Sequence, residues 1–185
     1  MKKSNALTTL SLAILGLLSR RARSGYDLHK LFSTPAMGSF SRSHGAIYPA
    51  LEKLEARGLI EGRIEREGTL HPRKVYTLTA EGQEALRQRL AQPLTHEDVV
   101  QRQGDLLMRF VFIDEVLGRE ETLRFLDEFL AFSEAYVASL REQLDGFPQE
   151  APLPPRFAME HGIARHRADV TWANRIIERL RGGES

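Results

Sequence analysis

The sequence predicts a mainly α-helical chain in two parts, with a short β-hairpin in the first part. Apolar residues recur at three- and four-residue spacing along most of the chain, as the buried face of a helix requires. Two short stretches between residues 59 and 79 instead alternate apolar and polar residues, as strands do. Charge separates the two parts, because residues 1–94 contain 15 Lys or Arg against 8 Asp or Glu, and residues 95–185 contain 11 against 17.

The composition limits the possible classes of protein. The 185 residues, of which 42% are hydrophobic, suffice for one ordinary domain or two small ones. The sequence contains no Cys, which excludes disulfides, thiolate metal sites and Cys nucleophiles. The net charge of +1 divides into +7 for the first part and −6 for the second, so the first part is suited to a polyanionic partner. The alternative is a chance separation of solvated surface charges.

The start of the sequence resembles a signal peptide, because two Lys residues precede an apolar run at residues 6–18. This run is shorter than the about 20 apolar residues that cross a bilayer. It also continues into another helical pattern rather than a cleavage site. We therefore expect a buried first helix, no membrane segment and a cytoplasmic protein.

The first two helices are predicted from spacing and capping residues. The buried face of the first helix consists of Leu7, Leu10, Ile14, Leu17 and Leu18. Ser24 is suited to cap a second helix, with Asp27 in its first turn. The apolar positions of this second helix are Tyr26, Leu28, Leu31 and Phe32.

The third helix contains a proline near its start. Its buried stripe consists of Ile47, Leu51 and Leu54. Gly58 stands where a left-handed C-cap residue belongs. If the helix begins near Ser43, Pro49 lies in its second turn and removes a hydrogen bond. If it begins at Gly45 or Ala46, Pro49 lies in or near the first turn, where proline is tolerated. The sequence leaves both starts open.

A β-hairpin and a fourth helix complete the first part. Residues 59–67 and 73–79 are predicted as two strands, because both are short, alternating and separated by turn residues. Thr79 is suited to cap a further helix, which ends at Pro93. Three helices, a two-stranded hairpin and a following helix make a winged helix-turn-helix.

Two motifs in this region resemble a known family. The third helix contains GAIYPALEKLEARGLI at residues 45–60, and the second strand continues as RKVYTLTAEG at residues 73–82. Together they resemble the signature of the PadR family of transcriptional regulators. The run at residues 12–32 is similar to the first two helices of that family.

The resemblance implies a fold and a division of labour along the chain. It implies a dimeric winged-helix protein that binds DNA, commonly a repressor, whose C-terminal helices complete the dimer. The long second part resembles the subfamily with several C-terminal helices rather than the compact one with a single long helix. We place a winged-helix DNA-binding domain at residues 1–92, and an all-helical dimerisation domain that could also sense an effector at residues 93–185.

Candidate DNA contacts lie on the third helix and on the hairpin, or wing. The helix candidates are Ser43, His44, Ala46, Tyr48 and Lys53. Hydroxyl and imidazole groups bond phosphates or base edges, and an Ala methyl contacts a thymine methyl. The wing candidates, which would lie along phosphates or in a minor groove, are Arg66, His71, Arg73 and Lys74. Further candidates for phosphate contacts are Arg20, Arg21 and Arg23. The alternatives are a core-edge position for Tyr48 and a merely solvated hairpin.

The acidic second part has helical spacing at residues 103–117, 119–144 and, after a proline-rich break, 156–181. These helices carry more apolar positions than they can bury alone, so we expect a symmetric homodimer. Candidates for the dimer interface, or for a pocket that binds a small apolar or aromatic effector, are Phe110, Phe129, Phe132, Tyr136, Trp172 and Ile176. The alternative for most of them is ordinary core packing.

Catalytic and metal-binding motifs do not emerge from the sequence. The stretch HEDVV at residues 96–100 lacks the second His of a zinc protease motif, and no Gly-rich phosphate loop is present. We expect no enzymatic activity, no cofactor and no metal. The predicted function is that of a sequence-specific DNA-binding transcriptional regulator, a repressor that binds a pseudo-palindromic operator as a homodimer. The alternative is a winged helix that docks a protein partner without binding an operator.

Overall fold

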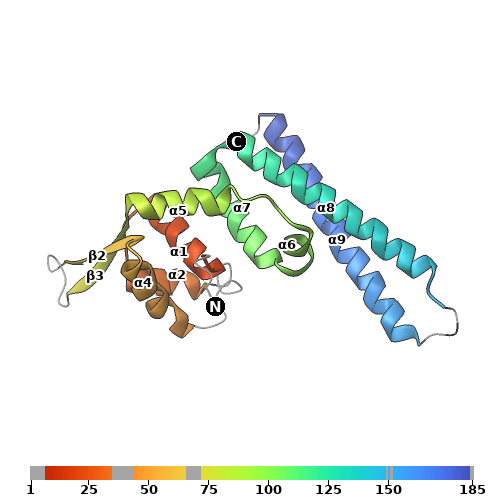
Figure 1. Cartoon of the computed structure of the whole chain (residues 1–185), viewed down its shortest axis with the longest axis horizontal. Coiled ribbons are helices and arrows are strands. Elements are labelled where there is room, and N and C mark those ends of the chain that lie inside the picture. The colour runs from red at the N-terminus through yellow and green to blue at the C-terminus, as the bar shows by residue number, and fades with distance from the viewer. Residues whose placement is uncertain (1–6, 35–43, 66–71, 149, 151, 184–185) are drawn as a thin grey trace. The chain divides into compact units, whose positions relative to one another are not determined.

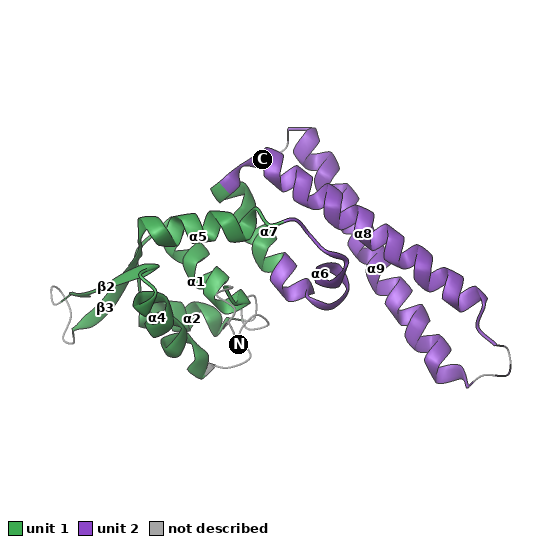
Figure 2. Cartoon of the chain, viewed as in Figure 1, with its two compact units in different colours: residues 1–92, 107–116 green, residues 93–106, 117–185 purple. Residues whose placement is uncertain are grey.

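The computed structural model of the chain describes residues 7–34, 44–65, 72–148, 150 and 152–183. The chain forms two compact units, which are coloured separately in Figure 2. The first unit comprises residues 1–92 and 107–116, and the second comprises residues 93–106 and 117–185. The described residues are mostly helical, with a small antiparallel sheet in the first unit, which confirms the predicted fold class. The sequence pattern did not predict that residues 107–116 belong to the first unit.

The first unit begins with α1 (Thr9–Arg20) and α2 (Gly25–Phe32). Helix α1 is buried on most of its surface, and Leu12, Ile14 and Leu15 are completely inaccessible. Ser24 caps α2 as predicted: its hydroxyl accepts the Asp27 amide hydrogen, and the Asp27 carboxylate accepts the Ser24 amide hydrogen. The prediction for Tyr26 was wrong, because this side chain at the start of α2 is 69% exposed.

The third helix starts in a way that accommodates its proline. A single 3₁₀ turn, η1 (His44–Ala46), leads into α4 (Ile47–Ala56). Pro49 is therefore the third residue of α4, where the backbone amide has no partner within the helix. Proline costs no hydrogen bond at this position, so the structure supports the later of the two predicted starts. At the other end Gly58 has a φ of 70°, which confirms the left-handed position.

The sheet of the first unit has three strands in the order β1-β3-β2. The predicted hairpin is present as β2 (Ile60–Glu65) and β3 (Arg73–Leu78), paired from Ile60 with Leu78 to Glu65 with Arg73. A third strand, β1 (Arg23–Ser24), pairs with β3 on its other side. The sequence did not predict β1, because two residues are too few for an alternating pattern. This strand fixes the start of α2 beside the wing.

Helix α5 (Ala80–Leu90) follows the wing and is capped by Thr79, as predicted. Its C-terminal end is held by Arg109, a residue that the sequence analysis did not select. The Arg109 side chain is 2% exposed, and it donates to the carbonyl oxygens of Leu90, at 3.0 Å, and of Gln92. A guanidinium at the negative end of a helix dipole stabilises that end. Arg109 thereby ties residues 107–116 to the winged helix.

The second unit consists of α6 (His96–Gln101), the first residues of α7 (Gln103–Leu117), α8 (Arg119–Asp145) and α9 (Leu153–Arg181). Helices α8 and α9 pack against each other as a long antiparallel hairpin (Figure 1). Helix α9 starts at Leu153, three residues before the predicted start, because proline is tolerated in its first turn. None of the described helices combines the length and the hydropathy that a bilayer crossing requires.

A polar cluster surrounds one buried side chain, His166, of the α8–α9 hairpin. The side chain of His166 on α9 is 3% exposed, and its ring contacts that of Tyr136 edge-on at a centroid distance of 4.8 Å. His96 contacts Tyr136 in the same manner at 5.5 Å. Asp169 lies 3.5 Å from His166 Nδ1 and accepts a hydrogen bond from Gln103 at 2.7 Å. The cluster thus connects α6, α8 and α9 with the first residue of α7.

Burial lowers the pKa of His166, and the charge of Arg165 acts in the same direction, whereas Asp169 partly opposes both. Near the ordinary pKa of histidine the unfolded chain therefore binds more protons at this residue than the folded chain does. We expect the free energy of unfolding to fall as the pH decreases from about 7.5 to about 5.5, with a slope from this group of up to about 1.4 kcal/mol per pH unit. A His166→Phe variant, which retains a ring against Tyr136, should lack this component in urea titrations.

The control for this prediction is His161→Phe, at an exposed position of the same helix. It should keep the pH dependence of the natural chain. Burial raises the pKa of Asp169, which acts in the opposite direction at lower pH, so the comparison is confined to the range above about pH 5.5. Parallel curves for the natural chain and His166→Phe would show that His166 titrates equally in both states.

Candidate nucleic-acid interface

The outer face of α4, together with the last residue of η1, presents three of the predicted DNA contacts. Ala46 is half-buried, Tyr48 is 49% exposed, and Lys53 is exposed one turn farther along. The inner face holds the predicted stripe of Ile47, Leu51 and Leu54, all buried. The exposure of Tyr48 favours a surface role over the core-edge alternative. The last residue of η1 and the first turn of α4 therefore offer a methyl group and a phenol to a partner.

Three predicted contacts, Ser43, Arg66 and His71, lie outside the described residues. His44 is described only through its backbone in η1. Their roles stay predictions.

Both predicted wing contacts that the structure describes, Arg73 and Lys74, have acidic partners. Arg73 Nη2 lies 3.2 Å from Glu65 Oε2 across the β2–β3 pair, and both side chains are half exposed. Lys74 Nζ lies 2.6 Å from Glu55 Oε2, and this hydrogen bond raises the pKa of Lys74. A phosphate that binds either cation therefore competes with a carboxylate.

Glu55 is a residue of the interface that the sequence analysis did not select. It lies in the last turn of α4, and its two carboxylate oxygens have different partners. Oε2 accepts from Lys74 on β3, and Oε1 accepts from the Gly62 amide on β2 at 3.2 Å. One carboxylate thus connects the helix to both strands of the wing. The motif at residues 45–60 contains Glu55, but sequence spacing does not reveal a partner 19 residues away.

A shallow depression of about 230 Å³ brings several of these groups together. It lies between the start of α2, the first turn of α4 and β3. Its lining residues are Ser24, Gly25, Tyr26, Tyr48, Pro72, Arg73, Lys74 and Tyr76. The structure therefore brings together Tyr48, Arg73 and Lys74 of the predicted contacts, and adds Tyr26, whereas Lys53 is not part of this lining.

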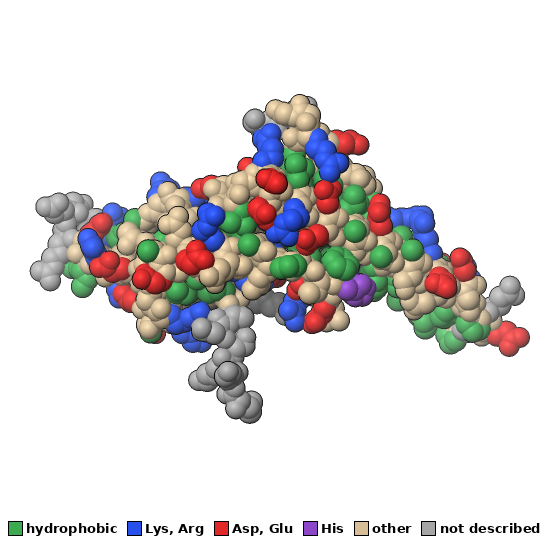
Figure 3. Space-filling view, turned by 45° about the horizontal axis from the view of Figure 1, so that its top comes forward, with side chains coloured by type: hydrophobic (Ala, Val, Ile, Leu, Met, Phe, Trp, Pro, Cys, Tyr) green, Lys and Arg blue, Asp and Glu red, His purple; other side chains and the backbone are tan. Residues whose placement is uncertain are grey.

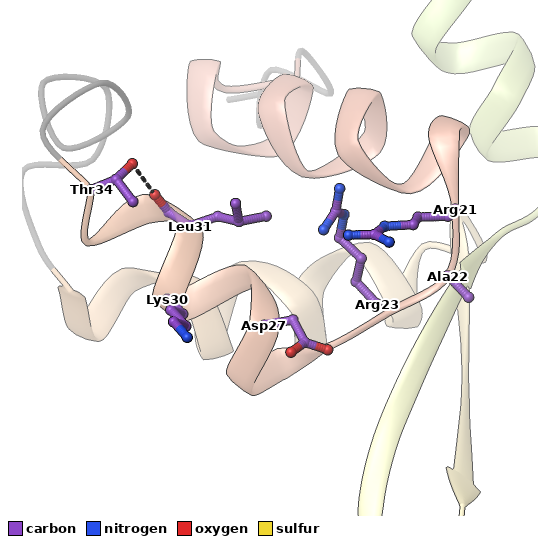
Figure 4. A pocket seen from close by; sticks show the side chains of 7 residues that line it. All are labelled: Arg21, Ala22, Arg23, Asp27, Lys30, Leu31 and Thr34. Atoms are coloured by element: carbon purple, nitrogen blue, oxygen red, sulfur yellow. Dashed lines mark hydrogen bonds between the residues drawn. The ribbon is translucent and has the colours of Figure 1, made fainter.

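A second depression, of about 450 Å³, lies between the end of α1 and α2 (Figure 4). It is lined by Arg21, Ala22, Arg23, Asp27, Lys30, Leu31 and Thr34. Of the three arginines selected from the sequence, Arg21 and Arg23 line it. Arg20 instead forms an ion pair with Glu115 at 2.6 Å and lies over the ring of Phe112. The structure therefore separates Arg20 from the other two arginines.

The aromatic candidates of the second part lie in different surroundings. Phe110 is half-buried and belongs to the first unit. Phe129 is 5% exposed and contacts Trp172 edge-on at a centroid distance of 5.9 Å, which is core packing between α8 and α9. The remaining half-buried candidates of the hairpin are Phe132, Tyr136 and Ile176. Their roles at a dimer interface or in effector binding stay predictions.

Comparison with known proteins identifies the family. The model of the transcriptional regulator PadR-like family matches residues 14–88, and the model called virulence activator alpha C-term matches residues 104–181. The negative transcriptional regulator PadR of Bacillus subtilis (strain 168) is 31% identical over 179 residues, which cover 92% of this chain and 97% of the relative. The chain belongs to the PadR family.

Two further similarities differ in extent. Transcriptional regulator YqjI of Escherichia coli (strain K12) is 37% identical over 79 residues, which are 43% of this chain and 36% of that relative. Among solved structures, Bacillus subtilis PadR in complex with operator DNA is 27% identical, with a TM-score of 0.44 and with 92% of this chain and 98% of that chain covered.

Membership of the PadR family makes this chain a transcriptional regulator and confirms the resemblance drawn from residues 45–60 and 73–82. The named relatives are transcriptional regulators rather than enzymes. Within the part of the chain that the structure describes, no group of three or more His, Asp and Glu side chains is arranged to hold a metal ion.

Proposed function

We propose that this PadR-family chain is a repressor that binds a pseudo-palindromic operator as a homodimer, with α4 and the wing on the DNA. The observation that carries the proposal is the exposed surface at the start of α2 and α4. Two exposed tyrosines, Tyr26 and Tyr48, lie there beside the cations of β3. Aromatic hydroxyls next to cations are suited to the oxygen atoms of a phosphate backbone.

Each group of this surface has a role that follows from its chemistry. Ala46, with Ser43 and His44 from the sequence, would contact base edges in the major groove, because the start of a recognition helix enters there. Tyr48 and Lys53 would contact the backbone on either side. The wing residues Arg66, His71, Arg73 and Lys74 would lie along phosphates, and the charge of +7 in residues 1–94 would steer the first unit to DNA.

Exposed apolar residues support a dimer. Leu153 and Phe157 lie one turn apart on α9 and are 58% and 55% exposed. Hydrophobic side chains also gather at this end of the α8–α9 hairpin in Figure 3. In the first unit Leu107 and Val111, again one turn apart, are each 46% exposed. Adjacent exposed apolar side chains of this kind mark partner surfaces, and a second copy of the chain is the partner that a palindromic operator requires.

Repression is supported by the relative that matches nearly the whole chain, which is named a negative transcriptional regulator. A small apolar or aromatic effector would act through half-buried apolar side chains. The half-buried candidates that we assign to this role, or to the dimer interface, are Phe110 of the first unit and Phe132, Tyr136, Trp172 and Ile176 of the second, whereas Phe129 packs in the core of the α8–α9 hairpin.

A gel shift with the DNA upstream of the gene for this protein tests the proposal. We expect a discrete complex that survives an excess of unrelated duplex and that weakens steeply as the salt concentration rises. Sedimentation of the same complex should give two chains per operator. If an excess of unrelated duplex abolishes the complex even at low salt, the result contradicts an operator-binding function. It then favours a winged helix that docks a protein.

The ion pair of Glu55 leads to a prediction about the wing. In a Glu55→Gln variant the amide oxygen can still accept the Gly62 amide hydrogen, but Lys74 loses its carboxylate partner. Lys74 should then bind a phosphate, so that affinity for nonspecific duplex rises. The slope of log affinity against log salt concentration should become steeper by the amount expected for about one additional phosphate contact. Fluorescence anisotropy across a salt series measures both quantities.

The matched control is Glu52→Gln, which removes the same charge from an exposed position of α4, one turn before Glu55. It should raise affinity less and leave the salt slope unchanged. An equal change of slope in both variants would mean that general charge, and not the release of Lys74, controls binding by the wing.

A further inference from the structure

The depression between α1 and α2 carries an excess of positive charge. Arg21, Arg23 and Lys30 line it, and no ion pair of these three is found within the described residues. Figure 4 shows the side chains of Arg21 and Arg23 extending below α1, with Asp27 on the facing helix. Ala22 and Leu31 supply apolar walls. The lining thus contains three cations against a single carboxylate.

The carboxylate of Asp27 is already engaged by the cap of α2. Its Oδ2 accepts from the Ser24 hydroxyl at 2.7 Å and from the Ser24 amide at 3.2 Å. These hydrogen bonds hold the pKa of Asp27 below its ordinary value, and the bond from the Ser24 hydroxyl has the larger effect. Burial lowers the pKa of Arg23, and the neighbouring charges of Arg21 and Arg20 act in the same direction, whereas Asp27 partly opposes them. Like charges therefore crowd this depression, and an added anion would relieve them.

The depression continues the surface assigned to DNA. Ser24 lines the smaller depression, together with Tyr48 and Arg73. Asp27, three residues later, lines the α1–α2 depression, together with Arg21 and Lys30. Asp27 interacts electrostatically with both Arg73 and Arg23. The cations of the wing and those of the α1–α2 depression therefore lie on two sides of the same helix start. A polyanion in contact with one group lies close to the other.

We propose that the α1–α2 depression binds a backbone phosphate of the same duplex that α4 and the wing contact. This proposal rests on the proposed operator-binding function. It joins Arg21 and Arg23, which the sequence offered only as separate candidates, with Lys30 in one phosphate site. Arginine guanidinium groups bind phosphate oxygens in pairs, and a Lys ammonium adds a point charge. The depression is open and carries no base-reading pattern, so the contact is independent of sequence.

A charge-matched pair of variants tests the proposal. Arg21→Gln/Lys30→Gln removes two exposed cations from the depression, and Arg141→Gln/Arg167→Gln removes two exposed cations from α8 and α9. In operator titrations the first variant should lower the salt slope by about one contact, because the depression binds a single phosphate, and weaken binding by about tenfold at about 0.1 M salt. The second should match the natural chain. Lys30→Glu alone provides a further variant, because its side chain is exposed at the end of α2.

Neutral methylphosphonate linkages, placed one at a time along the operator, identify the phosphate. We expect at least one position where neutralisation weakens the natural chain and the control variant but not Arg21→Gln/Lys30→Gln. The absence of such a position, or a salt slope equal to that of the control, overturns the proposal while operator binding itself stands. Failure of the natural chain to bind any operator instead refutes the proposed function.

A last experiment distinguishes the binding of a backbone phosphate from the binding of a free anion. Inorganic phosphate is titrated into the natural chain without DNA, and thermal unfolding is followed. Saturable stabilisation that disappears in Arg21→Gln/Lys30→Gln, together with an unchanged operator salt slope, would assign the depression to a small anion and overturn the DNA contact. No saturable stabilisation, together with the lowered slope, supports the backbone phosphate.

Discussion

Truncation of the chain before Leu153, which removes α9, is expected to abolish the dimer and to weaken binding of the whole operator by two orders of magnitude or more. Helix α9 covers Phe129 of α8 and carries Trp172, Leu153 and Phe157. If these residues join two chains, the two recognition helices bind two half-sites as a single event. An effective concentration in the millimolar range then multiplies the affinity by about 10² to 10⁴, and this factor is lost with the link. Sedimentation and operator titration measure the two effects.

The control for truncation is a duplex with a single half-site. The natural and truncated chains should bind it equally, because the winged helix lies in the first unit and keeps its own contacts. A full-length Leu153→Glu/Phe157→Glu variant provides a second test that leaves the buried face of α9 intact. A truncated chain that stays a dimer and binds the whole operator at full strength would place the dimer interface elsewhere.

Gly82→Ala is expected to lower the free energy of unfolding of the first unit by about 3 kcal/mol, because it overfills a tightly packed site. Gly82 lies in the first turn of α5, and an added Cβ atom would lie 1.9 Å from the carbonyl oxygen of Leu59. That oxygen also accepts the Thr79 amide hydrogen at 3.2 Å. The obstacle is backbone, so no side-chain rotation can relieve it. Urea titration followed by circular dichroism measures the loss.

The matched control is Gly104→Ala, also within a helix. An added Cβ atom there has no neighbour within 4 Å. Alanine favours a helix over glycine by about 1 kcal/mol, so this variant should be as stable as the natural chain or more stable. If Gly82→Ala were equally harmless, the contact of α5 with residue Leu59 would have to be looser than the structure shows.

The elements that could be predicted from the sequence are those set by local signals. Ser24 and Thr79 cap the helices that they were predicted to cap, and Gly58 has the left-handed conformation. The strands β2 and β3 follow from alternation over six residues each. Such signals act within one turn or one strand, so spacing and residue type suffice to find them. The family motif lies in the same segment, which is why the regulator class could be predicted as well.

Side-chain pairing in the candidate site could be predicted only in part. Lys74 was selected as a phosphate contact for its charge, but its contact with Glu55 spans 19 positions of sequence. Arg20 was grouped with Arg21 for the same reason, and its partner Glu115 lies 95 positions away. A surface charge has no periodicity that would indicate its partner, so these pairs follow from folding alone.

The sequence by itself determined the order of the longer helices and of β2 and β3, the caps of α2 and α5, the family, and which face of α4 is apolar. Only the tertiary structure decided that β1 joins the wing, that residues 107–116 return to the first unit, and that Arg109 holds the end of α5. The physical reason is the range of the forces involved. Periodicity and capping are set by near neighbours along the chain, whereas strand addition, charge burial and the convergence of cations beside α2 depend on residues that folding alone brings together.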